Sequence, residues 1–97
     1  MSVYVVIDIQ VKPEALEQVK AGLKAALPDT RAYDGCQGVD CYANTEDPNN
    51  LIVIDVGESK QHYEKYMAWR NGTGFTEQMT AALSAPPSFR HYERLDV

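Results

Sequence analysis

The chain has 97 residues, of which 44% are hydrophobic and 24% charged, and its formal net charge at pH 7 is −5. This length suffices for one domain with a modest core, so we take residues 1–97 as a single domain. The acidic balance disfavours nucleic acids and anionic membrane surfaces as partners, and no apolar run approaches the ~20 residues of a membrane span.

The first elements are a strand and a helix. Residues 3–11 carry apolar side chains on both alternating faces, which predicts a strand that is covered above and below. Lys12-Pro13-Glu14-Ala15 then begins a helix, with Pro at the first helical position and an acid in the first turn. We expect this helix to end at Pro28, after an apolar stripe formed by Leu16, Val19, Leu23 and Leu27.

A hairpin follows. Asp34-Gly35 indicates a turn, and residues 36–44 alternate between apolar and polar side chains, as in a strand with one wetter face. Asp47-Pro48-Asn49-Asn50 connects this strand to residues 51–57, which are again apolar on both faces. The third strand is therefore expected to be central in a sheet, like the first.

Two helical segments and a final strand complete the chain. Ser59 is a suitable N-cap for a helix over residues 60–70, which Asn71-Gly72 should interrupt. A further helical segment covers residues 74–84 and ends before two prolines. Residues 88–96 alternate between polar and apolar side chains and predict the last strand.

The order βαββαβ predicts an α+β fold of the ferredoxin-like type, with an antiparallel four-stranded sheet. In this arrangement the first and third strands are central and both helices cover one face. The opposite face would expose an apolar patch formed by Tyr4, Val6, Ile52 and Ile54. Because a lone molecule cannot cover such a patch, we expect a homodimer that pairs two sheets about a two-fold axis.

The two cysteines do not predict a metal site or a redox pair. Cys36 and Cys41 have a C-x4-C spacing with no nearby His to complete a zinc set. A reduced, partly buried pair of thiols is the expectation.

Four turn and cap segments occur in a characteristic order and at characteristic spacings: Val11–Glu14, Asp34–Gly38, Thr45–Pro48 and Ile54–Ser59. In these segments, which span nearly the whole length, the chain resembles the antibiotic biosynthesis monooxygenase family of small dimeric α+β barrels. It departs from the family pattern at Asp55 and Gly57, where members often have Glu and Trp, and at Tyr66, where many have His.

The resemblance implies a monooxygenase that needs no metal or flavin and oxidises a small hydroxylated aromatic or quinol with O2. In that chemistry the protein removes a proton from an electron-rich phenol, and the resulting anion passes an electron directly to O2. The protein supplies a dry aromatic pocket, a base or hydrogen-bond acceptor, and a donor that stabilises the anion.

Tyr66 and Tyr63 are two catalytic candidates, three residues apart on one helix face. As site residues, their hydroxyls would hold or deprotonate the substrate. As core residues, they would form hydrogen bonds to the backbone instead. Tyr66 is the stronger candidate because it occupies the family's His position.

Asp55 is the third catalytic candidate. If its carboxyl faces the pocket on the helix side of the sheet, burial raises its pKa and makes it a candidate base. If it faces a partner subunit, a salt bridge to an Arg there is the simpler role, and this structural interpretation is favoured.

Four further residues are predicted to bind the substrate: Trp69, Arg70, His91 and Phe75. Trp69 is placed on the turn between the helical segments, where it replaces the bulk missing at Gly57 or lies at an edge of the core. Arg70 either pairs with an anionic substrate oxygen or, as we prefer, complements the helix C-terminus. His91 is a titrating site group or a cross-strand neighbour, and His62 is expected to be solvated.

Two alternative functions were weighed against the monooxygenase. A non-catalytic small-molecule-binding or stress-associated dimer is motivated by the missing Trp and His. Haem degradation fits poorly, because the first strand has no Asn, Gly57 replaces the required Trp, and no His lies between residues 63 and 90. The chain enters a strand pattern almost at once, which leaves no room for a signal peptide, so a cytoplasmic location is the expectation.

Overall fold

The computed structural model describes residues 2–97. The elements in chain order are β1 (Val3–Gln10), a 3-10 turn (Pro13–Ala15), α1 (Leu16–Ala32), β2 (Cys36–Ala43), β3 (Asn50–Gly57), α2 (Lys60–Gly72), α3 (Phe75–Ala81) and β4 (Ser88–Glu93). No helix within residues 2–97 has the length and apolar character needed to cross a membrane.

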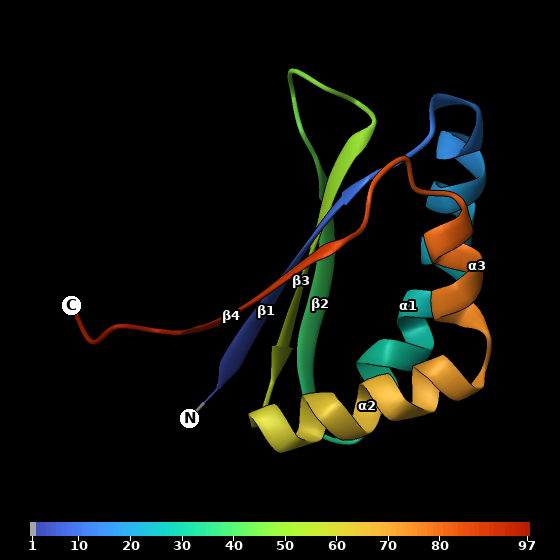
Figure 1. Cartoon of the computed structure of the whole chain (residues 1–97). Coiled ribbons are helices and arrows are strands. Elements are labelled where there is room, and N and C mark those ends of the chain that lie inside the picture. The colour runs from blue at the N-terminus through green and yellow to red at the C-terminus, as the bar shows by residue number, and fades with distance from the viewer. Residues whose placement is uncertain (1) are drawn as a thin grey trace.

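The four strands form one antiparallel sheet in the order β2-β3-β1-β4. β1 and β3 are therefore the central strands, as their apolar side chains on both faces predicted. The helices all lie on one side of this sheet (Figure 1). The ferredoxin-like α+β fold expected from the sequence is confirmed.

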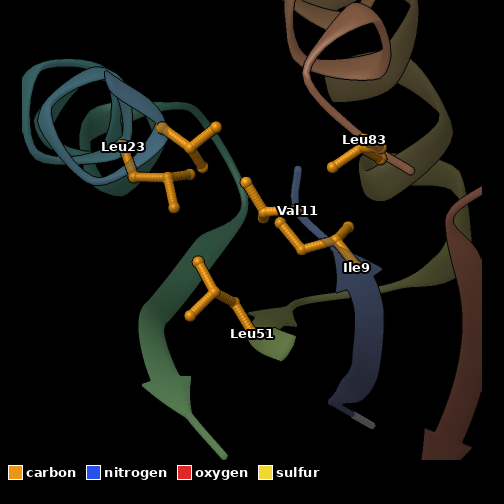
Figure 2. Packing of buried hydrophobic residues seen from close by; sticks show 6 residues of the cluster. Ile9, Val11, Leu23, Leu51 and Leu83 are labelled. Carbon is orange, nitrogen blue, oxygen red and sulfur yellow. The ribbon is translucent and has the colours of Figure 1, made fainter. Parts of the chain in front are cut away.

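The hydrophobic core occupies one end of the space between the helices and the sheet. Its buried members come from α1, from β1 and the residue after it, from the start of β3 and from the segment after α3: Ile9, Val11, Val19, Leu23, Leu51 and Leu83. Figure 2 shows the labelled side chains of this cluster converging from these elements. Val11 and Leu83 also form an isolated β-bridge, which ties the segment after α3 to the end of β1.

The first helix does not end at Pro28, as predicted, but continues to Ala32. A proline inside a helix removes one backbone hydrogen bond and crowds the preceding turn. Arg70 of α2 (Lys60–Gly72) holds the helix on both sides of the proline: it donates a hydrogen bond of 2.8 Å to the hydroxyl of Thr30, which is 2% exposed, and one of 2.7 Å to the carbonyl oxygen of Ala26. Tertiary contacts have therefore overridden the local stop signal.

Smaller corrections concern the boundaries of elements and the exposure of single side chains. Trp69 does not lie on a turn, because α2 continues through Asn71-Gly72. α3 is shorter than the predicted segment, and β4 ends at Glu93, which leaves Leu95 74% exposed. Cys41, expected to be partly buried, is exposed, whereas Cys36 is half-buried. In each case the local pattern indicated the element but misplaced its boundary or the depth of its side chains.

The face of the sheet opposite the helices is uncovered (Figure 1). The alternation of side chains along the central strands places Tyr4, Val6, Ile52, Ile54 and Val56 on this face, each of them half-buried. On the edge strands, Tyr42 and Tyr92 face the same way and are 51% and 47% exposed. We call these seven residues the open face. It contains the predicted apolar patch.

The turn before β2 depends on Gly35. Its φ of +90° lies in the left-handed region, and a Cβ at this position would meet the Cδ2 atom of His62 at 2.2 Å. His62 is half-buried rather than solvated, and its Nδ1 lies 2.8 Å from the hydroxyl of Ser59, the N-cap of α2. Gly35 therefore lets the turn approach the start of α2.

Replacing Gly35 by Ala should lower the free energy of unfolding by about 2 kcal/mol or more, because the new methyl group combines left-handed strain with a clash. Urea unfolding measures this loss. Gly22→Ala is the matched control: it lies inside α1 with open space around it, so it should be neutral or stabilising by up to about 1 kcal/mol. A Gly35→Ala protein as stable as the wild type would contradict the packing described for His62.

Candidate functional site

A cavity of about 100 Å³ lies between the helices and the sheet, next to the hydrophobic core. Its apolar wall includes side chains from β1, β3, α2, α3 and β4: Ile7, Val53, Met67, Phe75, Met79 and Phe89. The cavity reaches the surface where exposed Thr80 and Phe89 line it. Polar groups reach this mostly apolar space from Thr30, Asp55, Tyr66 and Arg70, and Thr76 and Thr80 add hydroxyls from α3.

Arg70, Thr30 and Tyr66 form a hydrogen-bonded triad on the helix side of the cavity. The Nε of Arg70 donates to the Tyr66 hydroxyl at 2.9 Å, and an Nη2 hydrogen donates to the Thr30 hydroxyl at 2.8 Å. The two hydroxyls are 2.7 Å apart. Helical spacing places Tyr66 and Arg70 one turn apart on α2, whereas Thr30 comes from the last turn of α1.

Of the two hydroxyl hydrogens in the triad, only one has an acceptor within the triad. In the bond between the hydroxyls of Thr30 and Tyr66, only one of the two can donate. Both oxygens already accept from Arg70, whose other recorded hydrogen bond goes to the carbonyl oxygen of Ala26. One hydroxyl hydrogen therefore remains available to a group in the cavity.

Arg70 is a buried cation without a carboxylate partner. Its side chain is 6% exposed, and no salt bridge to it occurs within residues 2–97. The guanidinium carbon lies 4.6 Å from the ring centre of Trp69, 4.8 Å from that of Phe75 and 5.7 Å from that of Tyr66. Aromatic faces attract a cation but do not neutralise it. Arg70 lies in the last turn of α2, as the role at the helix C-terminus requires, and it also lines the cavity.

Asp55 faces the helix side of the sheet and lines the cavity from β3. It is 6% exposed, and burial raises the pKa of its carboxyl to about 6. Its recorded hydrogen-bond contact is with the Cys36 thiol, at 4.0 Å from Oδ1. The sequence allowed either a carboxyl that faces the pocket or a carboxyl that forms a salt bridge to a partner subunit. The position of Asp55 on the helix side of the sheet matches the first of these.

Tyr63 lies behind Asp55 rather than in the main cavity. Its hydroxyl is buried and has no hydrogen-bond partner among residues 2–97, and Tyr63 lines a hollow of about 10 Å³ together with Asp55 and Tyr66. Burial raises the pKa of this phenol, and the nearby carboxyl of Asp55 raises it further. Its ring packs edge-on against His91, with ring centres 5.6 Å apart. Tyr63 is therefore a neutral neighbour of Asp55 and is poorly suited to act as a base.

The cavity brings together four of the seven predicted site residues: Asp55, Tyr66, Arg70 and Phe75. Tyr63, Trp69 and His91 do not line it. Trp69 is 38% exposed and stacks on Tyr33 with ring centres 5.2 Å apart. His91 is exposed on β4.

Thr30 is the polar site residue that sequence reasoning missed. It follows Leu27 by three residues and continues the apolar stripe of the first helix, so its position pointed inward. The expectation that Pro28 ends the helix concealed this signal. Thr30 could have been identified as a polar residue that continues the buried stripe of the helix one turn beyond a proline.

The fold and cavity define a ferredoxin-like α+β domain that has an apolar pocket under its helices. A model of the family described as antibiotic biosynthesis monooxygenase matches residues 2–81. The chain therefore belongs to the antibiotic biosynthesis monooxygenase family, as its resemblance implied.

Solved structures share this fold over almost the whole chain. Rv0793 from Mycobacterium tuberculosis is 23% identical with a TM-score of 0.88, and the alignment covers 100% of this chain and 98% of the other. A conserved protein from Methanosarcina mazei Go1 is 18% identical with a TM-score of 0.91, covering 98% and 94%. A protein described as an antibiotic biosynthesis monooxygenase is 17% identical with a TM-score of 0.87, covering 96% and 98%. No curated protein matches the chain.

Proposed function

We propose that the protein is a monooxygenase that uses O2 without a metal or flavin to oxidise a small hydroxylated aromatic bound in the cavity. The observation that carries this proposal is a buried carboxyl with a raised pKa in the wall of an apolar pocket that also contains a buried cation. Such a pocket binds an apolar ring, accepts an acidic proton and favours the resulting negative charge.

In the proposed reaction, Asp55 accepts the phenolic proton. With a pKa of about 6, its carboxyl is mostly ionised at neutral pH and still basic enough to act. The phenolate then transfers one electron to O2, and the resulting superoxide and phenoxyl radical combine at a ring carbon. The peroxide loses water to give a quinone. One oxygen atom of O2 stays on the ring, and the other leaves in water with the phenolic hydrogen and one ring hydrogen.

Oxygen uptake tests this proposal. With a panel of 1-naphthol, dihydroquinones and hydroxybenzoates as substrates, the protein should consume O2 above the rate of autoxidation in buffer, and 1-naphthol should yield 1,4-naphthoquinone. No uptake across this panel would overturn the oxidation and favour the non-catalytic binding protein instead.

Where uptake occurs, Tyr66→Phe should lower kcat/KM by about tenfold or more, because it removes the hydroxyl that accepts from Arg70 and contacts Thr30. Tyr33→Phe is the matched control, since the Tyr33 hydroxyl makes only a 3.5 Å contact with a backbone oxygen outside the cavity. Equal kinetics for the Tyr66→Phe and wild-type proteins would remove Tyr66 from the mechanism.

We also propose that the protein is a homodimer that pairs its open faces. Aliphatic side chains on the two central strands of an uncovered sheet face support this arrangement. A two-fold axis would place the same residues of both copies against one another.

A further inference from the structure

Two ionisable groups face the cavity from different elements. Asp55 projects from β3 in the sheet, and Arg70 projects from the last turn of α2. Both side chains are 6% exposed, and no salt bridge joins them. A buried acid and a buried base in one cavity normally pair, because pairing offsets the cost of removing each from water. Their separation therefore requires an explanation.

The two groups are placed to serve different parts of a ligand. If Arg70 stabilised the same oxygen that Asp55 deprotonates, both groups would contact that oxygen and lie within about 6 Å of each other. In the structure, no salt bridge joins the two groups, and the Nε and Nη2 atoms of Arg70 donate to Tyr66, Thr30 and the carbonyl oxygen of Ala26. The pKa of Asp55, which burial raises, agrees with this arrangement, because a cation in contact with the carboxyl would lower it. Arg70 is therefore placed to hold a second group on the ligand.

The triad suits an anionic group with two oxygens. Arg70 supplies the positive charge, and one hydroxyl hydrogen of Thr30 or Tyr66 remains without an acceptor in the triad. The structure records hydrogen bonds from Nε and Nη2 of Arg70 but none from Nη1 within residues 2–97. A carboxylate can accept from the guanidinium with one oxygen and from the free hydroxyl with the other.

The volume of the cavity restricts the ring that it can hold. At about 100 Å³ it is smaller than the ~150 Å³ apolar cavity that accommodates benzene. A single ring can enter if the flexible side chains of Met67 and Met79 adjust. A fused ring system would have to extend through the mouth at Thr80 and Phe89.

We propose that the ligand is a monocyclic aromatic acid, with its carboxylate bound by the Arg70–Thr30–Tyr66 triad and its phenolic hydroxyl directed at Asp55. This inference rests on the proposed function and names its substrate class. In this arrangement the carboxylate of the ligand neutralises the charge of Arg70. Neutral phenols then bind weakly, because they leave the buried guanidinium without a partner.

Titration calorimetry with a matched pair of ligands tests this inference on the unmodified protein. At pH 7.5, 3-hydroxybenzoate carries a carboxylate, whereas 3-hydroxybenzamide has nearly the same shape and no charge. The benzoate should bind at least tenfold more tightly than the benzamide. Equal affinities, or a preference for the benzamide, would overturn the inference.

Arg70→Met tests the assignment of the preference to the triad. This variant should bind the two ligands with affinities equal within about twofold. Lys65→Met is the matched control, because it removes an exposed cation from another side of α2 and should keep the tenfold preference. If Arg70→Met does not fold, Thr30→Val takes its place and should reduce the preference. A preference that survives in a folded variant of the triad would overturn the assignment.

Oxygen uptake separates this inference from the proposed reaction. If naphthols are oxidised and Asp55→Asn abolishes this activity, but the benzoate has no advantage in binding, the substrate class is wrong and the monooxygenase stands. If the benzoate binds preferentially through Arg70 without any O2 consumption, the anion site is supported and the monooxygenase fails.

Discussion

Replacing Asp55 by Asn should raise the free energy of unfolding at pH 8 by up to about 3 kcal/mol and lower kcat/KM by about 100-fold or more. Both effects have one cause. The carboxyl is buried in an apolar wall, where its ionised form is costly but supplies the base of the proposed reaction. Asn keeps the shape of the side chain and removes the charge, so stability and activity change in opposite directions.

The pH dependence follows from the raised pKa. Asp55 titrates at about 6 in the folded protein, against an ordinary value of 3.8. Below the ordinary pKa, the carboxyl is protonated in both the folded and the unfolded states, and the wild type keeps its full stability. Between about pH 4 and pH 6 the unfolded state loses this proton first, so stability falls as the pH rises. The advantage of the Asn variant should therefore grow over this range and be absent near pH 3.

Urea unfolding between pH 3 and pH 8, at one fixed protein concentration, measures this difference. Asp29→Asn is the matched control, because Asp29 is exposed on α1 and away from the cavity. If Asp55→Asn destabilises the protein at pH 8, the folded protein stabilises the ionised carboxyl, and the description of Asp55 as an unpaired buried carboxyl is overturned.

Replacing Ile54 by Asp should convert the proposed dimer into monomers at micromolar concentration. Ile54 lies on the open face of β3, where it pairs in register with Val6 on β1 and Asp40 on β2. Because a two-fold axis relates the two copies, the substitution places two charges in the apolar contact, one from each copy. Burying an unpaired carboxylate costs several kcal/mol, which exceeds what such an interface can absorb.

Analytical ultracentrifugation of both proteins provides the measurement. The wild type should sediment as twice the chain mass, and the Ile54→Asp protein as a single chain with unchanged circular dichroism. Gln61→Asp, an exposed change on α2, should leave the dimer intact. A wild type that sediments as a single subunit at micromolar concentration would overturn the proposed dimer.

The sheet and its order could be predicted because each strand carries its own pattern of burial. β1 and β3 have apolar residues on both faces, and in a four-stranded sheet this pattern is expected of the two central strands. The helices cover one of these faces, and the proposed dimer would cover the other. Helix boundaries were less predictable. Pro28 is a valid local stop signal, yet contacts of Thr30 and Ala26 with Arg70 stabilise the turn beyond it.

The sequence by itself determined the strand order, through local periodicity and turns, and the family, through the resemblance, which also made Tyr66 a pocket candidate. Only the tertiary structure decided which way Asp55 faces and which residue completes the triad. Thr30 is far from Tyr66 and Arg70 in the chain, and they meet because α1 and α2 pack on the same side of the sheet. The pKa of Asp55 depends on the burial that this packing creates, and no local pattern contains that information.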